Sequence, residues 1–187
     1  VKRERFIECP LAHPTLMLRS EVFRTLMYQD LPWPEDYDLL LRAHVAGYSF
    51  GSLPKVVLAW RDHGKRLSRT SDTYSLEAFM QCRAFYLAQD FLPATRRYTL
   101  WGHGPTGRRL RTALGCLGHW PDTIVEVHPR RIGQTIHGAP VIAPAALSKA
   151  QHAPLIACVS GASARQEIRA HLQHQGWNEG TDFVCAA

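Results

Sequence analysis

Three glycines with the spacing of a phosphate-binding turn stand near the middle of the chain. Gly102, Gly104 and Gly107 form a Gly-x-Gly-x-x-Gly pattern that directly follows a short strand predicted over 98–101. In such a turn the first glycine permits the tight bend, the second lets a pyrophosphate approach the backbone, and the third lets helix and strand pack closely. The start of the next helix then offers unpaired N–H groups to an anion. The pattern favours nucleotide binding; the alternative is a tight turn in a unit that binds nothing.

An acidic residue about 20 positions after the first glycine would hold a ribose hydroxyl of the bound nucleotide. Glu126 stands near that spacing, but inside a strand that we predict over 123–127. His128 occupies the predicted end of the strand, where the acid is usual, and Arg130 and Arg131 behind it can meet a phosphate instead. We therefore expect the three glycines and Glu126 to bind NAD(P) or another nucleotide.

Glu35 and Asp36 are adjacent carboxylates at the predicted start of a helix, after Trp33 and ahead of a basic loop. Such a pair can supply a general base together with a neighbour that orients it or tunes its pKa. The alternative is structural, because acidic residues in a first helical turn complement the helix dipole. Asp36 and Asp38 form an Asp-x-Asp pattern, but on a helix their side chains point about 200° apart, so they cannot grip one cation together.

His63 stands in a polar loop predicted over 62–71, which also contains Gly64. An imidazole beside Arg61 and Lys65 can bind a metal ion or a phosphate. The alternative is an ordinary polar loop histidine without a binding role. No His-x-x-x-His pattern, Gly-x-Ser-x-Gly turn or catalytic cysteine context accompanies it.

Two stretches of different character must position these residues, and the character changes at 92–97. We therefore predict a first unit over 1–93, rich in aromatic residues, and a second unit over 97–187. In the first unit, apolar spacing at 0, 3, 4, 7 and 8 predicts a helix that begins at Glu35 and stops at Gly47. Its other predicted elements are strands over 15–19 and 53–60 and helices over 20–26 and 72–91.

In the second unit, short apolar runs alternate with helical patterns. The predicted strands are 98–101, 123–127, 139–142, 155–159 and 182–185, and the predicted helices are 106–117 and 164–175. Strands that alternate with helices require parallel pairing and right-handed crossovers. The predicted fold class is therefore α/β, with a small doubly wound parallel sheet after a segment of helices and a few strands.

Composition and charge exclude several classes of protein. The 187 residues are 45% hydrophobic and 20% charged, which excludes collagen, coiled coil and wholesale disorder. The formal net charge of +6 comes from scattered arginines without interleaved aromatic residues, so nucleic acid is not an expected partner. The sequence contains no uninterrupted apolar run of 18 residues, so we expect no transmembrane segment. Five scattered cysteines without a Cys-x-x-Cys pair favour reduced thiols, hence a location in the cytoplasm, including the inner face of the membrane.

Several motifs between residues 9 and 70 occur together in one order and spacing. They are Cys-Pro-Leu-Ala-His-Pro-Thr from residue 9, Pro-Glu-Asp-Tyr-Asp-Leu-x-Leu-Arg from residue 34, Leu-Pro at 53–54, Arg-x-His from residue 61, and Ser68. The set resembles the second half of family 2 glycosyltransferases, which have the GT-A fold. The resemblance implies a C-terminal portion of such an enzyme. The N-terminal half, with nucleotide-binding strands and a metal-gripping Asp-x-Asp, has no counterpart in this sequence.

The resemblance also implies roles for individual residues. Asp36, with Glu35 beside it, would deprotonate an acceptor hydroxyl for in-line attack on the anomeric carbon, which inverts its configuration. His63 would complete the site of a divalent metal, Mg²⁺ or Mn²⁺, or of the diphosphate, in a cleft shared with Asp36. Arg66 and Ser68 would lie in a loop that closes over the donor and excludes water. The implied partners are a nucleotide-sugar donor and a glycan or lipid-linked acceptor in surface polysaccharide or glycoconjugate synthesis, although this portion alone is expected to be inactive.

The second unit carries a resemblance of its own. Glu-Val-His-Pro-Arg-Arg-Ile-Gly from residue 126 and His-Gly-Ala-Pro-Val-Ile from residue 137 are similar to a stretch of the small Rossmann-like domains joined to bacterial sugar-modifying enzymes. Here His128 replaces an acid of that pattern, and no Tyr-x-x-x-Lys pair for hydride transfer is present. The resemblance implies a regulatory or nucleotide-sensing accessory role. The alternatives are an NAD(P)-binding oxidoreductase or nucleotide sensor that uses 97–187, and a non-catalytic interaction protein.

Overall fold

The computed structural model describes residues 1–61, 63–92 and 94–187. Asp62 of the predicted loop and Pro93 of the predicted boundary therefore lie outside the described residues. Helices make up the regular structure of the first part: α1 Ser20–Leu26, α2 Glu35–Val45, α3 Leu67–Thr70, α4 Leu76–Tyr86, the short 3₁₀ helices η1 His13–Thr15 and η2 Asp72–Tyr74, and the π-helical turn η3 Leu87–Phe91. A membrane-spanning helix, which needs both length and an apolar sequence, is not found in the described residues.

All six strands of the described residues belong to one sheet in the later part of the chain. They are β1 Arg97–Trp101, β2 Trp120–Val125, β3 Thr135–Ile136, β4 Ala139–Ile142, β5 Leu155–Ala157 and β6 Phe183–Cys185. The helices between them are α5 Pro105–Cys116, η4 Pro144–Ala146, α6 Lys149–His152 and α7 Ala162–His174. The chain is thus a mixed α/β protein, as its alternating pattern predicts.

The order of strands in the sheet is β3-β4-β2-β1-β5-β6. Every neighbouring pair is parallel except the edge pair β3 and β4, which is antiparallel. The chain starts in the middle of the sheet at β1, moves outward through β2 to β4, and then returns to the other side of β1 for β5 and β6. The order in which the chain adds strands to the sheet therefore reverses between β1 and β5. The connections that follow these two strands run to opposite sides of this point.

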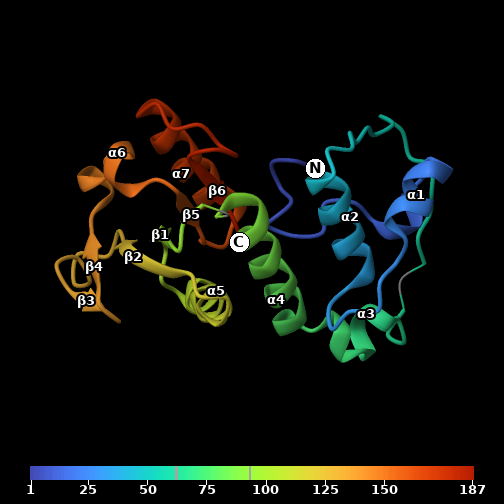
Figure 1. Cartoon of the computed structure of the whole chain (residues 1–187), viewed down its shortest axis with the longest axis horizontal. Helices are drawn as coiled ribbons and strands as arrows, with labels where there is room; N and C mark the ends of the chain where they lie inside the picture. Colours follow the sequence, from blue (N-terminus) through green and yellow to red (C-terminus); the bar gives the residue numbers. More distant parts are fainter. Residues whose placement is uncertain (62, 93) are drawn as a thin grey trace.

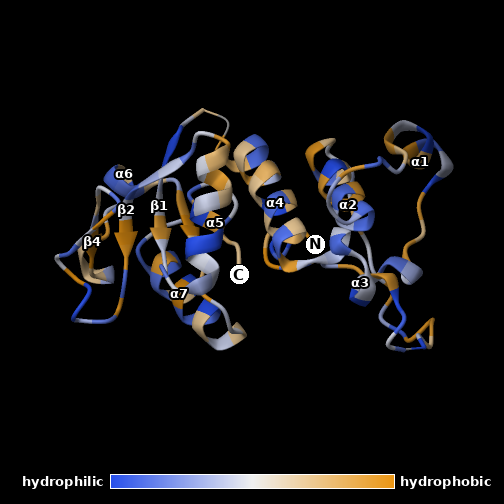
Figure 2. Cartoon of the chain, turned by 90° about the horizontal axis from the view of Figure 1, so that it is seen from below, coloured by the Kyte–Doolittle hydropathy of each residue, from blue (hydrophilic) through white to orange (hydrophobic). Residues whose placement is uncertain are grey.

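Helices cover both faces of the sheet. Ile156 packs in a hydrophobic cluster with Leu114 of α5 and with residues of α4, whereas its neighbour Leu155 packs in a second cluster with Leu172 of α7. This alternation is the period of two expected of a strand that is buried on both faces. Figure 2 shows hydrophobic residues along β1 and β2, and both kinds of residue on α5 and α7, which each have one face toward the sheet.

Helix α4 lies between α5 and α2 in both views of the chain (Figures 1 and 2). Its buried Arg83 donates hydrogen bonds to the carbonyl oxygen of Ala186 at 3.0 Å and to that of Ile7. The hydrophobic cluster on this side of the sheet runs from Phe6 and residues of α2 to residues of β1 and β2. One continuous core therefore spans the two predicted units.

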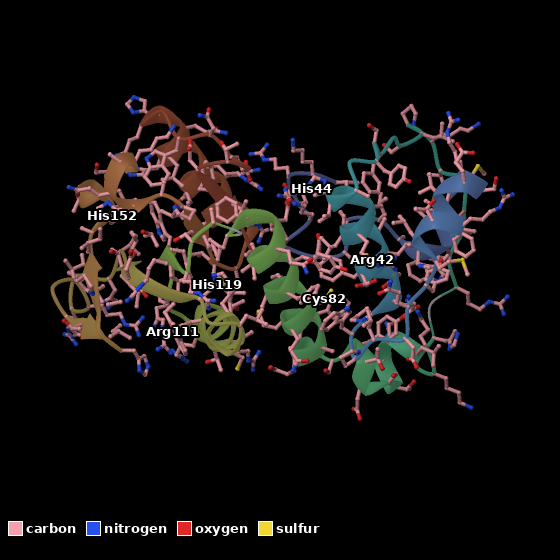
Figure 3. The ribbon with its side chains drawn as sticks, viewed as in Figure 1. Arg42, His44, Cys82, Arg111, His119 and His152 are labelled. Atoms are coloured by element: carbon pink, nitrogen blue, oxygen red, sulfur yellow. The ribbon has the colours of Figure 1, made fainter. Side chains whose placement is uncertain are left out.

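Helix α2 is tied to its surroundings by a buried carboxylate. Asp38 is fully buried and accepts hydrogen bonds from Trp33 Nε1 at 3.1 Å, Tyr86 Oη at 2.6 Å and Arg42 Nε at 2.6 Å. Arg42, labelled in Figure 3, also donates to the carbonyl oxygens of Leu26 and Met27 at the end of α1. Asp38 thus has a structural role, because its carboxylate connects α2 to Tyr86 of α4.

The predicted strands of the first unit are wrong. Thr15 ends η1, the following residues 16–19 have no regular structure, and residues 53–60 form no strand. A strand requires a neighbour for its N–H and C=O groups, and the strands of the described residues all lie after residue 96. The predicted helix over 72–91 is also divided, because Ser75 caps α4 by accepting a hydrogen bond from the Ala78 N–H at 3.2 Å.

Candidate functional site

The glycine turn joins β1 to α5, and its three glycines lack a side chain for different reasons. Gly102 has φ of 94°, and a Cβ there would lie 2.5 Å from Val159 Cγ2. A Cβ at Gly107 would lie only 2.0 Å from the carbonyl oxygen of Gly102, so this glycine lets α5 pack on the turn. Gly104 differs, because a Cβ there would meet no atom within 4 Å apart from those of its own chain neighbours. Protein packing therefore explains Gly102 and Gly107 but leaves the space beside Gly104 open.

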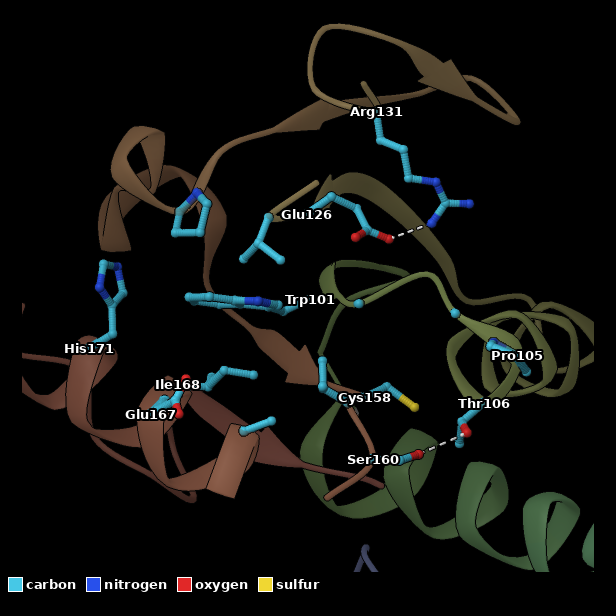
Figure 4. A pocket seen from close by; sticks show the side chains of 16 residues that line it. Trp101, Pro105, Thr106, Glu126, Arg131, Cys158, Ser160, Glu167, Ile168 and His171 are labelled. Atoms are coloured by element: carbon cyan, nitrogen blue, oxygen red, sulfur yellow. Dashed lines mark hydrogen bonds and ion pairs between the residues drawn. The ribbon is translucent and has the colours of Figure 1, made fainter. Parts of the chain in front are cut away.

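A cavity of about 600 Å³ lies beside this turn, at the carboxyl ends of β1, β2 and β5 (Figure 4). The last residue of β1, Trp101, and residues that follow β2 and β5, Glu126 and Cys158, line it together with Gly102 and Gly104. The volume is within the range of roughly 300–1,000 Å³ that is usual for small-molecule sites. The cavity also lies at the point where the strand order reverses, which is where ligands of open parallel sheets bind.

Two helices begin at the edge of this cavity. Pro105 and Thr106 of α5 line it, and so do Ser160 and Ala164 at the start of α7. Neither first turn contains an acidic residue, and no side chain caps either one. Thr106 Oγ1 and Ser160 Oγ lie 3.2 Å apart, which holds the two helix starts side by side. Unpaired backbone N–H groups and the positive ends of two helix dipoles therefore converge at one end of the cavity.

Glu126 directly follows β2, which ends at Val125, so the prediction that this acid lies inside the strand is wrong. The observed strand starts and ends earlier than its apolar pattern indicates, and Glu126 therefore reaches the cavity. Its Oε1 accepts hydrogen bonds from the His103 N–H at 2.9 Å and from Arg131 Nη1 at 2.7 Å. His128 is exposed on the following loop, where its Nδ1 accepts from the Arg130 N–H at 3.2 Å.

Three residues on the α7 side of the cavity have no counterpart among the predicted site residues. Trp101, Glu167 and His171 line it, and the rings of Trp101 and His171 meet edge to face with centroids 5.5 Å apart. Their sequence positions look ordinary, since Trp101 ends an apolar run and the other two stand on a helix. Only the spacing of four residues, which puts Glu167 and His171 on one helix face, could have indicated that they act together.

The adjacent carboxylates Glu35 and Asp36 open α2, as predicted. Glu35 accepts a hydrogen bond from Tyr74 Oη, which lies 2.7 and 2.8 Å from its two oxygens. Asp36 Oδ1 accepts from the Tyr37 N–H at 2.7 Å. Burial raises the pKa of Asp36, and the charge of Glu35 raises it further. A carboxyl group with a raised pKa is suited to general base catalysis.

His13 and Tyr28 form a chain of polar groups that leads to Asp36. His13 Nδ1 lies 3.9 Å from Asp36 Oδ2, and Tyr28 Oη lies 3.1 Å from His13 Nε2. The charge of His13 lowers the pKa of Asp36 and so opposes the effect of burial. The sequence prediction missed both residues as site residues, although His13 belongs to the Cys-Pro-Leu-Ala-His-Pro-Thr run that carries the family resemblance.

His63, Arg66 and Ser68 lie in or next to α3, away from any contact described for Asp36. His63 and Ser68 are exposed, and the Arg66 guanidinium stacks on the Trp60 ring at 3.9 Å. Neither Asp36 nor His63 lines the cavity at the glycine turn or a smaller one of about 270 Å³ beside Leu92. The shared cleft of Asp36 and His63 therefore stays a prediction. Within residues 1–61, 63–92 and 94–187, no group of three or more His, Cys, Asp or Glu side chains can hold a metal ion.

Comparison of the chain with protein-family models, with curated proteins and with solved structures finds no match.

Proposed function

We propose that the α/β unit over 97–187 is a Rossmann-like module that binds a nucleotide through its diphosphate. The observation that carries this proposal is the open space at Gly104, which lines the cavity and where a Cβ would meet no atom within 4 Å beyond its chain neighbours. A glycine that packing does not require is expected where a ligand must approach the backbone closely. Gly102 then permits the turn, Gly104 leaves room for the ligand, and Gly107 lets the helix pack against the turn.

The charge of the site favours an anionic ligand. The starts of α5 and α7 direct unpaired N–H groups into the same end of the cavity, and the hydroxyls of Thr106 and Ser160 lie beside them. The guanidinium of Arg131 lines the cavity with one nitrogen bound to Glu126. A diphosphate satisfies these donors better than a neutral group, because the aligned helix dipoles favour negative charge.

Glu126 is suited to the ribose of the same nucleotide. Both of its described hydrogen bonds use Oε1, so Oε2 remains able to accept a hydroxyl from the cavity. A carboxylate after the second strand is the usual ribose acceptor in dinucleotide-binding sheets. The module therefore suits a nucleoside diphosphate, with NAD(P) as the alternative, and we propose a nucleotide-sensing role beside another activity.

Calorimetric titration with nucleoside diphosphates and with NAD(P)H tests this proposal. We expect saturable binding by the wild-type chain and at least about tenfold weaker binding by Gly104→Val, because the valine side chain occupies the space beside the turn. Gly51→Val is the matched control, since a Cβ at Gly51 also meets nothing within 4 Å but lies far along the chain from the cavity. Absence of binding, or equal binding by Gly104→Val, would refute the proposal.

A second candidate function is sugar transfer by the first unit, and the raised pKa of Asp36 favours it. Asp36 would remove the proton of an acceptor hydroxyl while that oxygen attacks the anomeric carbon of a nucleotide-sugar donor. The bond from this carbon to the nucleoside diphosphate breaks as the new glycosidic bond forms, and the configuration inverts. Glu35, held by Tyr74, would keep the local charge that tunes the base.

The surface of the first unit carries exposed apolar side chains that a larger transferase would cover. Large apolar side chains between residues 17 and 76 are exposed, among them Met17 at 94%, Val56 at 93% and Leu76 at 74%. We propose that these side chains pack against another part of the transferase, because removal of apolar surface from water is favourable. His63 is the only implied metal ligand of this chain, and no metal-binding cluster surrounds it among the described residues, so we derive no step through a metal ion.

Transfer assays on the natural polypeptide that contains this chain test the second candidate. Asp36→Asn is expected to lower kcat by about 10²–10⁴-fold, the usual contribution of a general base. Glu77→Gln, a change at an exposed helical glutamate of α4 outside this site, is the matched control and is expected to leave kcat unchanged. Turnover by Asp36→Asn at the rate of the unaltered protein would contradict the assignment of the base.

A further inference from the structure

The cavity at the glycine turn has a second polar wall on the side of α7. Glu167 and His171 stand one helical turn apart, so their side chains share one face of α7, and both line the cavity. Trp101 lies between this wall and the glycine turn in Figure 4. The diphosphate end, the indole ring and the α7 wall are thus parts of one space.

The polar groups of this wall are not used by the described protein residues. Glu167 is exposed and accepts no hydrogen bond and forms no ion pair among residues 1–61, 63–92 and 94–187. His171 Nε2 is buried and has no hydrogen-bond partner there either. The edge-to-face contact with Trp101 fixes the plane of the imidazole. A carboxylate and an oriented imidazole therefore face the cavity with free hydrogen-bonding capacity.

The position of Glu167 along α7 determines how far it lies from a phosphate bound at the start of this helix. Glu167 follows the first residue of α7, Ala162, by five positions, which is about 8 Å along the axis at 1.5 Å per residue. A phosphate at the start of α7 and a group bound by Glu167 are thus separated by about the span of one sugar ring. An apolar indole face beside this path suits the C–H face of such a ring, while its hydroxyls point to the carboxylate and imidazole.

We infer that Trp101, Glu167 and His171 form a sugar subsite, so the ligand of this cavity is a nucleoside diphosphate sugar. The inference rests on the proposed nucleotide binding and adds the class of ligand. The nucleoside diphosphate binds at the helix starts and Glu126, and the glycosyl group extends over Trp101 to α7. A nicotinamide ring, which is flat and carries a single carboxamide, uses fewer of the free acceptors of this wall.

Paired titrations of the wild-type chain test the inference: UDP against UDP-glucose, GDP against GDP-mannose, and dTDP against dTDP-glucose, with NADH as a separate ligand. In at least one pair we expect the sugar conjugate to bind about tenfold or more tightly than its nucleoside diphosphate, since hydrogen bonds to a charged acceptor add that much. Glu167→Gln is expected to remove most of this preference and to leave the affinity for the nucleoside diphosphate within about twofold.

Glu77→Gln is the matched control, because Glu77 is also an exposed helical glutamate but belongs to α4. Equal affinity for both members of every pair, or a loss in Glu167→Gln that is the same for both members, would overturn the sugar subsite while nucleotide binding stands. Tighter binding of NADH than of every sugar conjugate would overturn it as well. If no nucleotide binds at all, the proposed function itself fails and the sugar subsite fails with it.

Discussion

Adding one methyl group at Gly107 or at Gly104 distinguishes the role of the glycine turn in folding from its role in ligand binding. At Gly107 the new Cβ would lie 2.0 Å from the carbonyl oxygen of Gly102, so α5 must move away from the turn. Such overpacking costs about 1–3 kcal/mol, and for a chain of this size about 2–12 °C in Tm. At Gly104 nothing lies within 4 Å and φ is −73°, so Gly104→Ala costs only about 0.5 kcal/mol for a poorer helix cap.

Thermal unfolding followed by circular dichroism, together with nucleotide titration, measures both effects. We expect Gly107→Ala to unfold at a clearly lower temperature than the wild type. Gly104→Ala is expected to unfold within about 2 °C of the wild type and still to bind nucleotide more weakly, because its methyl group takes up ligand space. Gly51→Ala, at another open glycine, is expected to change neither quantity.

The reasoning is refuted if Gly104→Ala destabilises the chain as much as Gly107→Ala, because the space beside Gly104 would then not be open. It is also refuted if Gly107→Ala leaves Tm unchanged. Nucleotide affinity that survives Gly104→Ala and Gly104→Val at the wild-type level would remove the argument for a phosphate at this turn.

Further predictions concern the start of α2. Burial raises the pKa of Asp36 above its usual 3.8, so stability falls as the pH rises from the usual to the raised value. Asp36→Asn is therefore expected to increase the free energy of unfolding at pH 7 but not at about pH 3, as denaturant titrations at both pH values can measure. His13→Gln is expected to raise the pKa of Asp36 further, because the charge that lowers it is lost, and carboxyl ¹³C chemical shifts measure this; an unchanged pKa would show that His13 does not act on Asp36. Asp38→Ala removes the acceptor of Arg42 Nε, Trp33 Nε1 and Tyr86 Oη and is expected to lower the free energy of unfolding by about 3–5 kcal/mol; a loss below 1 kcal/mol would contradict the buried network.

Local patterns predict the second unit well. The predicted strand over 139–142 matches β4, and the predicted helix over 106–117 differs from α5 by one residue at each end. These elements combine an apolar pattern of clear period with glycine or proline at their ends, and the parallel pairing follows from their alternation. The antiparallel β3 was not predicted, since two residues are too few to show a period.

The first unit shows where sequence patterns fail. The run over 53–60 has the β-branched and apolar residues of a strand, yet no strand of the described residues pairs with it, and Val56 is 93% exposed. Whether a segment forms a strand depends on a neighbouring strand as much as on its own residues. The sequence of one segment does not indicate whether such a neighbour is present. The helix at Glu35 was predicted correctly because its hydrogen bonds are local.

The candidate site was predicted in part for a similar reason. The glycines, Glu126 and the Glu35–Asp36 pair belong to short motifs, so the sequence indicated them. Trp101 and His171, by contrast, come from separate elements that meet only through the order of the strands. A contact between a strand end and a distant helix leaves no pattern in a single sequence.

The most direct measurement of the central claim is the change in backbone amide ¹H–¹⁵N chemical shifts on titration with a nucleoside diphosphate. We expect the largest changes at Gly104 and Thr106 and at residues 160–164, where the starts of α5 and α7 border the cavity. Spectra that remain unchanged, or changes confined to residues outside both helix starts, would contradict a diphosphate site at this end of the sheet.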